Sequence, residues 1–120
     1  MSPKNKPGFF RRIINAFFYS LKGLAAVFRN EAAFRQELLL IIPLVPLAVL
    51  FEKTGSGRAL MISSLFLILI LELINSAVEA VVDRFGSEWH ELAGRAKDMG
   101  SAAVLLGFVN ALVVWIFVLT

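Results

Sequence analysis

The chain contains no cysteine and a single histidine, His90, among its 120 residues. Without cysteine, a disulfide framework and a thiolate metal site are both excluded, and one histidine excludes a zinc site built from several histidines of one chain. Charged residues are also scarce, at 18%, while 58% of the residues are hydrophobic. These proportions are not those of a soluble domain, and they indicate a membrane protein whose chemistry rests on carboxylates and cations.

The two glycine-rich loops that commonly bind phosphate groups are absent as well. The chain has 8 glycines, but none of them forms a G-x-x-x-x-G-K-[ST] or a G-x-G-x-x-G pattern. Any bound phosphate must therefore be met by cationic side chains, for which Arg12 and Lys97 are candidates. The net charge of +3 fits cationic flanks of membrane spans, and we expect no nucleic-acid partner.

The amino-terminal segment divides into a polar tail and a basic amphipathic helix. Residues 1–8 hold two prolines, two lysines and a glycine, which predicts a mobile tail rather than a signal peptide. Over residues 9–29, phenylalanine and other apolar residues recur at helical spacing opposite a cationic face, which predicts a helix in the plane of the membrane interface. This helix is either a simple anchor or also presents Arg12, Tyr19 and Arg29 to a polyanionic ligand.

Three segments are long and apolar enough to cross a membrane. The expected spans cover residues 32–51, 59–82 and 102–119. Pro43 and Pro46 lie inside the first span and predict a bend near Ile42, and a loop rich in Gly and Ser follows at 52–58. The predicted fold is an all-α membrane protein, in one domain, with an amphipathic surface helix and three transmembrane helices.

The distribution of lysine and arginine predicts the orientation in the membrane. Seven of the 12 lie in residues 1–37, two in 52–58 and three in 83–98. By the positive-inside rule, the amino terminus and the loop after the second span are cytoplasmic, and the first loop and the carboxyl terminus face outward. We therefore expect the acidic and cationic groups to meet at the cytoplasmic face.

The segment 71–83 carries a polar stripe on a helix that is otherwise built for lipid. At about 100° per residue, Glu72, Asn75, Glu79 and Asp83 fall within an arc of roughly 80°. A carboxylate inside a bilayer costs on the order of 3 kcal/mol or more, so this stripe needs a metal ion, a cation or a water-filled cleft. Oxygen ligands without sulfur suit Mg²⁺ and phosphate groups better than zinc or iron, so we interpret the stripe as part of an active site.

Three stretches carry a resemblance to a known family. They read NEAAFRQE at 30–37, ELINSAVEAVVD at 72–83 and GSEWHELAGRAKDMGSAAV at 86–104. With them the chain resembles the bacterial integral-membrane diacylglycerol kinases over nearly its full length. The resemblance implies a homotrimer of small three-span chains that uses ATP and Mg²⁺ to phosphorylate membrane diacylglycerol, giving phosphatidate and ADP.

The resemblance also implies roles for individual residues. Glu72 is the implied base for the lipid hydroxyl, supported by Asn75 and Asp83, and Glu31 and Glu79 are the implied Mg²⁺ ligands. The implied nucleotide-binding residues are Arg12, Tyr19, Glu31, Glu79, Glu88, Trp89, His90, Lys97 and Asp98. The implied lipid-binding residues are Arg12, Ser20, Arg35, Gln36, Glu37, Glu72 and Ser101.

Simpler roles stay open for several of these residues. An ion pair at a helix end with Arg84 or Arg95 is a common use for a residue such as Asp83. His90 is equally compatible with a packed loop residue, and Asn75 with a hydrogen bond between helices.

Other functions also remain as alternatives. The chain departs from the family pattern at Leu21, where some members carry tryptophan, and at Pro43 and Pro46 in the first span. These departures leave the catalytic carboxylates intact and concern the fit of the lipid tails. The related undecaprenol kinases are the nearest alternative. A small proton-coupled transporter and a purely structural membrane protein are further ones, and they are distinguished by lipid-dependent ATP turnover and by Mg²⁺-dependent nucleotide binding.

Overall fold

The computed structural model describes residues 6–120, which form two compact units. The first unit ends at Ala32 and the second covers Ala33–Thr120. Each unit is described by itself. The tail predicted over residues 1–8 lies mostly outside the described residues.

The first unit is built around helix α1, Phe9–Asn30. Its aromatic side chains are about half exposed or more, and two neighbouring pairs, Phe9 with Phe10 and Phe17 with Phe18, pack edge to face with centroids 5.5 and 5.9 Å apart. Rings left exposed in this way fit a surface that is covered by something apolar.

Helix α1 ends where the backbone of Glu31 becomes extended, with φ −117° and ψ 106°. The Glu31 N–H still donates to the Val27 carbonyl at 2.9 Å. Asn30 belongs to α1, and its side-chain amide donates to the Ala26 carbonyl at 2.8 Å. The sequence suggests Asn30 as the cap of the next helix, and this prediction is wrong because the amide is used inside α1.

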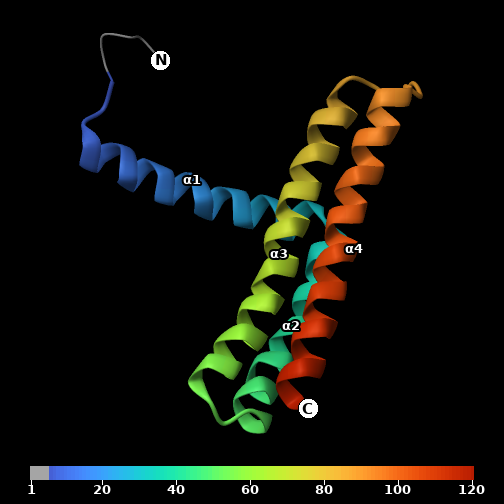
Figure 1. Ribbon diagram of the computed structural model, residues 1–120. Coiled ribbons are helices and arrows are strands. Elements are labelled where there is room, and N and C mark those ends of the chain that lie inside the picture. The colour runs from blue at the N-terminus through green and yellow to red at the C-terminus, as the bar shows by residue number, and fades with distance from the viewer. Residues whose placement is uncertain (1–5) are drawn as a thin grey trace. The chain divides into compact units, whose positions relative to one another are not determined.

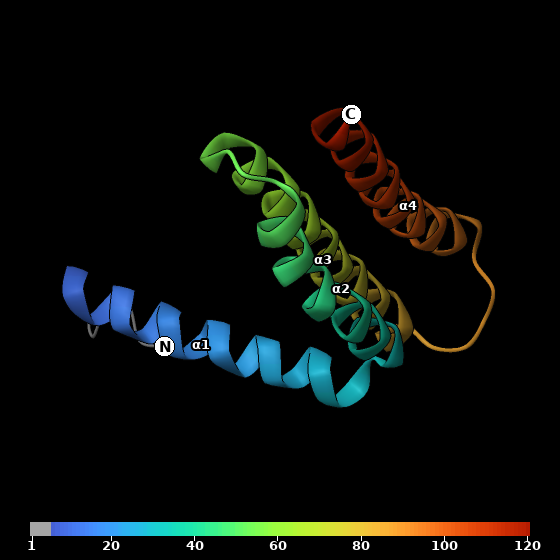
Figure 2. The ribbon, with the colours of Figure 1, turned by 90° about the horizontal axis from the view of Figure 1, so that it is seen from below.

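The second unit contains three long helices: α2 (Ala32–Phe51), α3 (Gly55–Arg84) and α4 (Glu91–Leu119). By length and composition all three are candidate membrane spans. The most extensive packing is between α3 and α4, which run antiparallel (Figures 1 and 2). The carboxyl terminus lies at the end of this unit that holds the α2–α3 loop, and the α3–α4 connection lies at the opposite end (Figure 1).

Both α3 and α4 are longer than the apolar spans expected from the sequence. Helix α4 begins at Glu91, eleven residues before the expected span start at 102, because the polar stretch is helical from Glu91 onward. Helix α2 continues through Pro43 and Pro46, although each proline removes one backbone N–H donor from the helix.

The α2–α3 loop satisfies its own polar groups. Thr54 caps α3 by accepting from the Gly57 N–H at 3.1 Å. The Arg58 guanidinium donates to the Val49 and Glu52 carbonyls at 2.8 and 2.6 Å, so it satisfies carbonyls at the end of α2.

Glu52 is held within the same loop. Its Oε1 accepts from the backbone N–H groups of Lys53 and Thr54, at 2.8 and 3.1 Å. These bonds, first from Thr54 and then from Lys53, favour the charged carboxylate and hold the pKa of Glu52 below its usual value.

The apolar core of the second unit joins all three helices. Ile41 of α2, Leu65 and Ile68 of α3 and Ala111 of α4 form one buried cluster. Gly107 allows α3 and α4 to approach closely, since a Cβ there would fall 2.8 Å from Leu71 Cδ1. This cluster fixes the register of the three helices beside the polar stripe.

Candidate active site

The polar stripe of α3 becomes more exposed toward the α3–α4 connection. Glu72 is 5% exposed and Asn75 is 8% exposed, whereas Glu79 is partly buried and Asp83 is exposed. All four lie on one helix at spacings of three or four residues, which keeps them on one face. The stripe therefore leads from a buried carboxyl group to a solvent-accessible end.

Helix α4 closes one side of this stripe through Gly100. A Cβ added to Gly100 would overlap the side-chain oxygen of Asn75, so a larger residue there would displace that amide. The sequence alone does not reveal this contact, because it depends on how α4 packs against α3. The signal that identifies it is the pairing of Gly100 and Gly107 on one face of α4, two turns apart.

Three buried polar atoms stand out along the stripe. Among the described residues, Glu37 Oε2, Asn75 Oδ1 and Ser76 Oγ are buried without a hydrogen-bond partner. An unsatisfied buried polar group costs about 1–3 kcal/mol, so these atoms, two on α3 and one on α2, mark positions that are not optimised for folding alone. They suit a polar ligand that approaches between the helices.

Glu37 reaches the stripe from α2. Its partly buried carboxyl group is a neighbour of the Glu72 carboxyl group. The sequence assigns Glu37 to the lipid substrate only through the family resemblance and does not reveal the contact with Glu72, because the register between α2 and α3 is a tertiary property.

A hollow of about 690 Å³ lies at the α3–α4 connection. It is lined by the end of α3, the connecting loop and the start of α4. The predicted nucleotide-binding and supporting residues among its lining are Asp83, Glu88, Trp89, His90 and Lys97. A hollow of this size is in the range of small-molecule sites.

Two exposed aromatic residues also line this hollow. Phe85 and Trp89 are 84% and 83% exposed. Sequence reasoning selected Trp89 but not Phe85, whose position directly after α3 becomes apparent only once the helix end is known.

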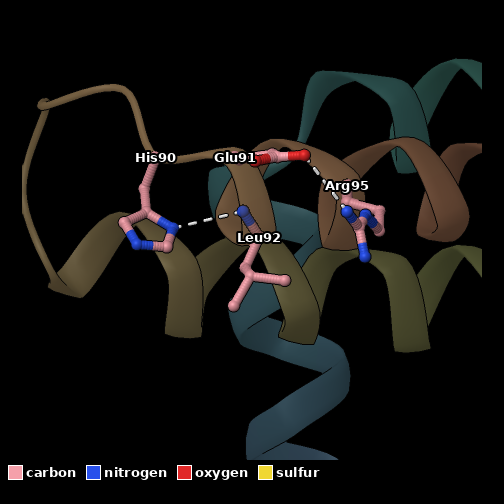
Figure 3. Close-up of polar contacts among 4 residues, drawn as sticks. All are labelled: His90, Glu91, Leu92 and Arg95. Atoms are coloured by element: carbon pink, nitrogen blue, oxygen red, sulfur yellow. Dashed lines mark hydrogen bonds and ion pairs between the residues drawn. The ribbon is translucent and has the colours of Figure 1, made fainter.

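An ion pair joins the two helices at the hollow. Lys97 Nζ lies 2.6 Å from Asp83 Oδ1. The helix-end ion pair considered for Asp83 therefore exists, but Arg84 or Arg95 as its partner is wrong. Arg95 instead pairs with Glu91 at 3.2 Å, one turn away on α4 (Figure 3).

His90 has a defined structural role at the start of α4. It is the N-cap residue, and its Nδ1 accepts from the Leu92 N–H at 3.1 Å (Figure 3). Accepting at Nδ1 places the proton of the neutral imidazole on Nε2. The cap and a contact with nucleotide through Nε2 are compatible.

The remaining predicted site residues fall into two groups. In the first unit, Arg12 and Tyr19 are exposed, and Glu31 is partly buried. Ser20 is exposed and donates its hydroxyl proton to the Ala16 carbonyl of its own helix at 2.8 Å. In the second unit, the exposed members are Arg35, Gln36, Asp98 and Ser101.

The donor set fits magnesium better than a metal that needs a full protein cage. The part of the chain that the structure describes contains no group of three or more His, Cys, Asp or Glu residues placed to hold a metal. Mg²⁺ is commonly bound by one or two carboxylates together with water and substrate phosphates. Glu79, partly buried between the deep acid and the hollow, is suited to such a role.

Comparison with known proteins agrees with this geometry. Residues 18–119 match the model of the family described as prokaryotic diacylglycerol kinase. The chain is 54% identical to the diacylglycerol kinase of Escherichia coli K12 over 110 residues, which covers 92% of this chain and 90% of the relative.

Two further relatives give a similar picture. The diacylglycerol kinase of Haemophilus influenzae is 52% identical over 86% of this chain and 87% of its own length. That of Pseudomonas aeruginosa is 50% identical over 91% of this chain and 89% of its own length. With a family match over most of its length and relatives at 50–54% identity, the chain belongs to the prokaryotic diacylglycerol kinase family.

Proposed function

We propose that this protein transfers the γ-phosphate of ATP to the hydroxyl group of membrane diacylglycerol, producing phosphatidate and ADP. The observation that carries the proposal is the buried Glu72 on a polar stripe that leads to a hollow with a lysine. A lipid hydroxyl enters from the membrane side, and a soluble nucleotide enters from the hollow. The names of the relatives support the substrate.

The reaction uses positioned groups rather than covalent chemistry by the protein. The lipid hydroxyl oxygen attacks the γ-phosphorus, the bond from this phosphorus to the bridging oxygen breaks, and ADP leaves. Glu72 accepts the hydroxyl proton. Its burial at 5% exposure keeps water from competing with the lipid for the phosphoryl group.

The nucleotide is bound mainly at the hollow. Glu88, Trp89 and His90 contact the nucleotide there, and Lys97 meets its phosphates as a point charge, with Asp98 nearby on α4. Arg12 and Tyr19 of α1 are also assigned to the nucleotide, as the family resemblance implies. Glu31 and Glu79 would hold Mg²⁺, which would supply positive charge to neutralise the phosphate oxygens.

The lipid is bound by polar residues around the start of α2 together with three others. This group consists of Arg12, Ser20, Arg35, Gln36, Glu37 and Ser101. Asn75 and Asp83 support the site from the stripe. Helix α1 lies in the membrane interface with its phenylalanines in lipid, consistent with their exposure.

We propose that the protein acts as a homotrimer in the bacterial inner membrane, with its amino terminus cytoplasmic and its carboxyl terminus periplasmic. The large apolar side chains left exposed on all three long helices supply surface for lipid and for further copies. The lysine and arginine distribution supports the orientation.

The test is direct phosphorylation of defined lipids. The purified protein is incubated with Mg-ATP and vesicles that contain diacylglycerol or undecaprenol, and the phosphorylated lipid is identified by mass spectrometry. Phosphatidate as the main product supports the proposal. Undecaprenyl phosphate would move the protein to the related substrate class, and no lipid-dependent ATP turnover would overturn the kinase function.

A further inference from the structure

We infer that copies of this chain pack side by side in the membrane, with the Asn110 amide of one copy donating a hydrogen bond to the Ile42 carbonyl of the next. Helix α4 supplies the donor, and the proline-containing face of α2 supplies the acceptor. The inference rests on the homotrimer of the proposed function and deepens it, because it names the faces through which the copies meet.

Asn110 carries a polar side chain at the centre of an apolar span. It lies halfway along the expected span 102–119, and its side chain is exposed. The residues around it on the same face of α4, Leu106, Val113 and Phe117, are exposed and apolar. Within residues 6–120 its amide makes no hydrogen bond. An amide that faces hydrocarbon without a partner is costly, so this position calls for a polar neighbour.

Three other polar side chains of the α3 and α4 spans bond within the chain. Trp115 donates its ring N–H to the Met61 carbonyl at 3.3 Å, which joins α4 to α3. Ser63 and Ser64 donate to carbonyls of their own helix, at 3.1 and 2.6 Å. Asn110 differs from all three, so its partner comes from outside the chain.

The exposed face of α2 provides backbone acceptors that its own helix does not use. A helical carbonyl accepts from the N–H four residues later, and proline has no N–H. Pro46 therefore leaves the Ile42 carbonyl without its usual donor, and Pro43 does the same for the Leu39 carbonyl. All four residues are exposed and lie on the face of α2 turned away from buried Ile41. In membranes, neighbouring helices satisfy such carbonyls.

The donor and the acceptor lie at one depth in the membrane. Ile41 and Ala111 belong to the same buried cluster, so α2 and α4 are level there. Ile42 directly follows Ile41, and Asn110 directly precedes Ala111. Copies related by rotation about the membrane normal keep each residue at the same depth. Asn110 of one copy is therefore level with the Ile42 carbonyl of the next copy.

A second copy fits this pair of groups better than lipid. Lipid tails offer neither a donor nor an acceptor at the centre of the bilayer, whereas each copy brings an unused donor on α4 and an unused acceptor on α2. Because the two faces differ, each copy uses α4 toward one neighbour and α2 toward the other. This is the head-to-tail contact that closes into a ring.

The first experiment measures dissociation of the oligomer in detergent micelles. Asn110→Leu removes the donor, and Pro46→Ala restores an N–H that occupies the Ile42 carbonyl within α2. Each should raise the dissociation constant by about 3- to 30-fold. The double variant should dissociate no more readily than either single variant, because both substitutions remove the same bond.

The matched control for this experiment is Pro43→Ala. It removes a proline from the same helix but supplies no donor to the Ile42 carbonyl, so the dissociation constant should stay unchanged. The helical content of every variant, measured by circular dichroism in the same detergent, verifies that it is folded.

The second experiment uses the absence of cysteine from the chain. Leu106→Cys places a thiol one turn before Asn110 on α4, and Leu39→Cys places one on the exposed face of α2. Copies that carry one substitution each, with tags of different length, are co-expressed and oxidised with copper phenanthroline. A mixed disulfide-linked dimer is expected. Leu112→Cys, which faces away from Asn110 on α4, is the matched control and should give none with Leu39→Cys.

Several outcomes would overturn the inference. They are an unchanged dissociation constant in Asn110→Leu and Pro46→Ala, additive losses in the double variant, and a mixed dimer that forms as readily with Leu112→Cys as with Leu106→Cys. An effect of Asn110→Leu that is coupled to Pro43→Ala instead of Pro46→Ala would overturn the choice of acceptor. All of these leave the kinase function intact. Absence of phosphatidate with the unmodified protein would refute the proposed function and leave the contact between copies standing.

Discussion

Two glutamates of the second unit, Glu52 and Glu72, show how differently one side chain is used. Glu52 lies in the α2–α3 loop and accepts hydrogen bonds from the adjacent backbone of Lys53 and Thr54. Glu72 is buried on the α3 stripe, and its carboxyl neighbour there, Glu37, is another acid from a different helix.

The surroundings of the two acids differ in the same way. Around Glu52, the loop groups are satisfied locally, and Arg58 donates to two backbone carbonyls. Around Glu72, Asn75 and Ser76 each keep a buried oxygen without a partner. An acid whose bonds are all local stabilises a turn, whereas an acid among unsatisfied groups is placed for a ligand.

The largest effect is expected from the two acids themselves. Glu72→Gln should lower turnover by at least about 100-fold while nucleotide binding and the oligomer persist, because only the proton acceptor is lost. Glu52→Gln should leave turnover unchanged. Both are measured as initial rates of lipid phosphorylation. Near-normal turnover in Glu72→Gln would show that Glu72 is not the base, and the functional difference between Glu72 and Glu52 would disappear.

The next effect concerns the metal. Replacing Glu31 or Glu79 with alanine removes one carboxylate ligand, so the Mg²⁺ concentration for half-maximal activity should rise at least about tenfold. The measurement is a Mg²⁺ titration at saturating lipid, with Glu52→Ala as the control. Titration curves that overlay the unmodified protein would show that these two acids are not ligands.

A smaller effect is expected from glycine substitutions, which should lower turnover at the α3 stripe but only stability at the α2–α3 loop. A Cβ at Gly100 would overlap the amide of buried Asn75, and one at Gly57 would fall 2.7 Å from Glu52 Cδ. Gly100→Ala should lower turnover by up to about tenfold, because it displaces a residue of the site. Gly57→Ala should lower only the thermal midpoint. Both assays are run on both variants, and a loss of turnover in Gly57→Ala would contradict the separation.

The smallest effect is a dependence of stability on pH in the loop. The pKa of Glu52 is lowered from 4.5 by folding, so its contribution to stability is present above pH 4.5 and is lost as the pH falls through the lowered value. The thermal midpoint of the unmodified protein should exceed that of Glu52→Gln at neutral pH, and the difference should vanish in acid. A difference that persists in acid would indicate a role for this residue other than its charge.

Much of the architecture follows from periodicity along the chain. The sequence predicts an all-helical membrane fold, and the structure has three helices that are candidate spans. Long apolar runs are predictable in this way because a backbone in lipid must satisfy its own hydrogen bonds, and a helix does so within one segment. The polar stripe is likewise recognisable from its spacing of three and four residues. Its gradient of burial, from Glu72 to Asp83, agrees with that reading.

What sequence reasoning missed are contacts between helices. The pairs Glu37 with Glu72 and Asp83 with Lys97 depend on how far one helix is shifted along another, which no local pattern encodes. Asn30 was misjudged for a related reason, since its amide can cap a helix or bond within one, and the choice depends on where α1 ends.

The glycine contacts of α4 also set its position along α3. Gly100 beside Asn75 and Gly107 beside Leu71 prevent α4 from sliding along α3, because a shift of one turn, about 5.4 Å, would place a larger side chain against either residue. Lys97 therefore starts at a fixed height along α3, roughly 9 Å along the axis from the level of Glu72. The packing of α4 on α3 therefore sets the axial distance between a phosphate group bound at Lys97 and the carboxyl group of Glu72.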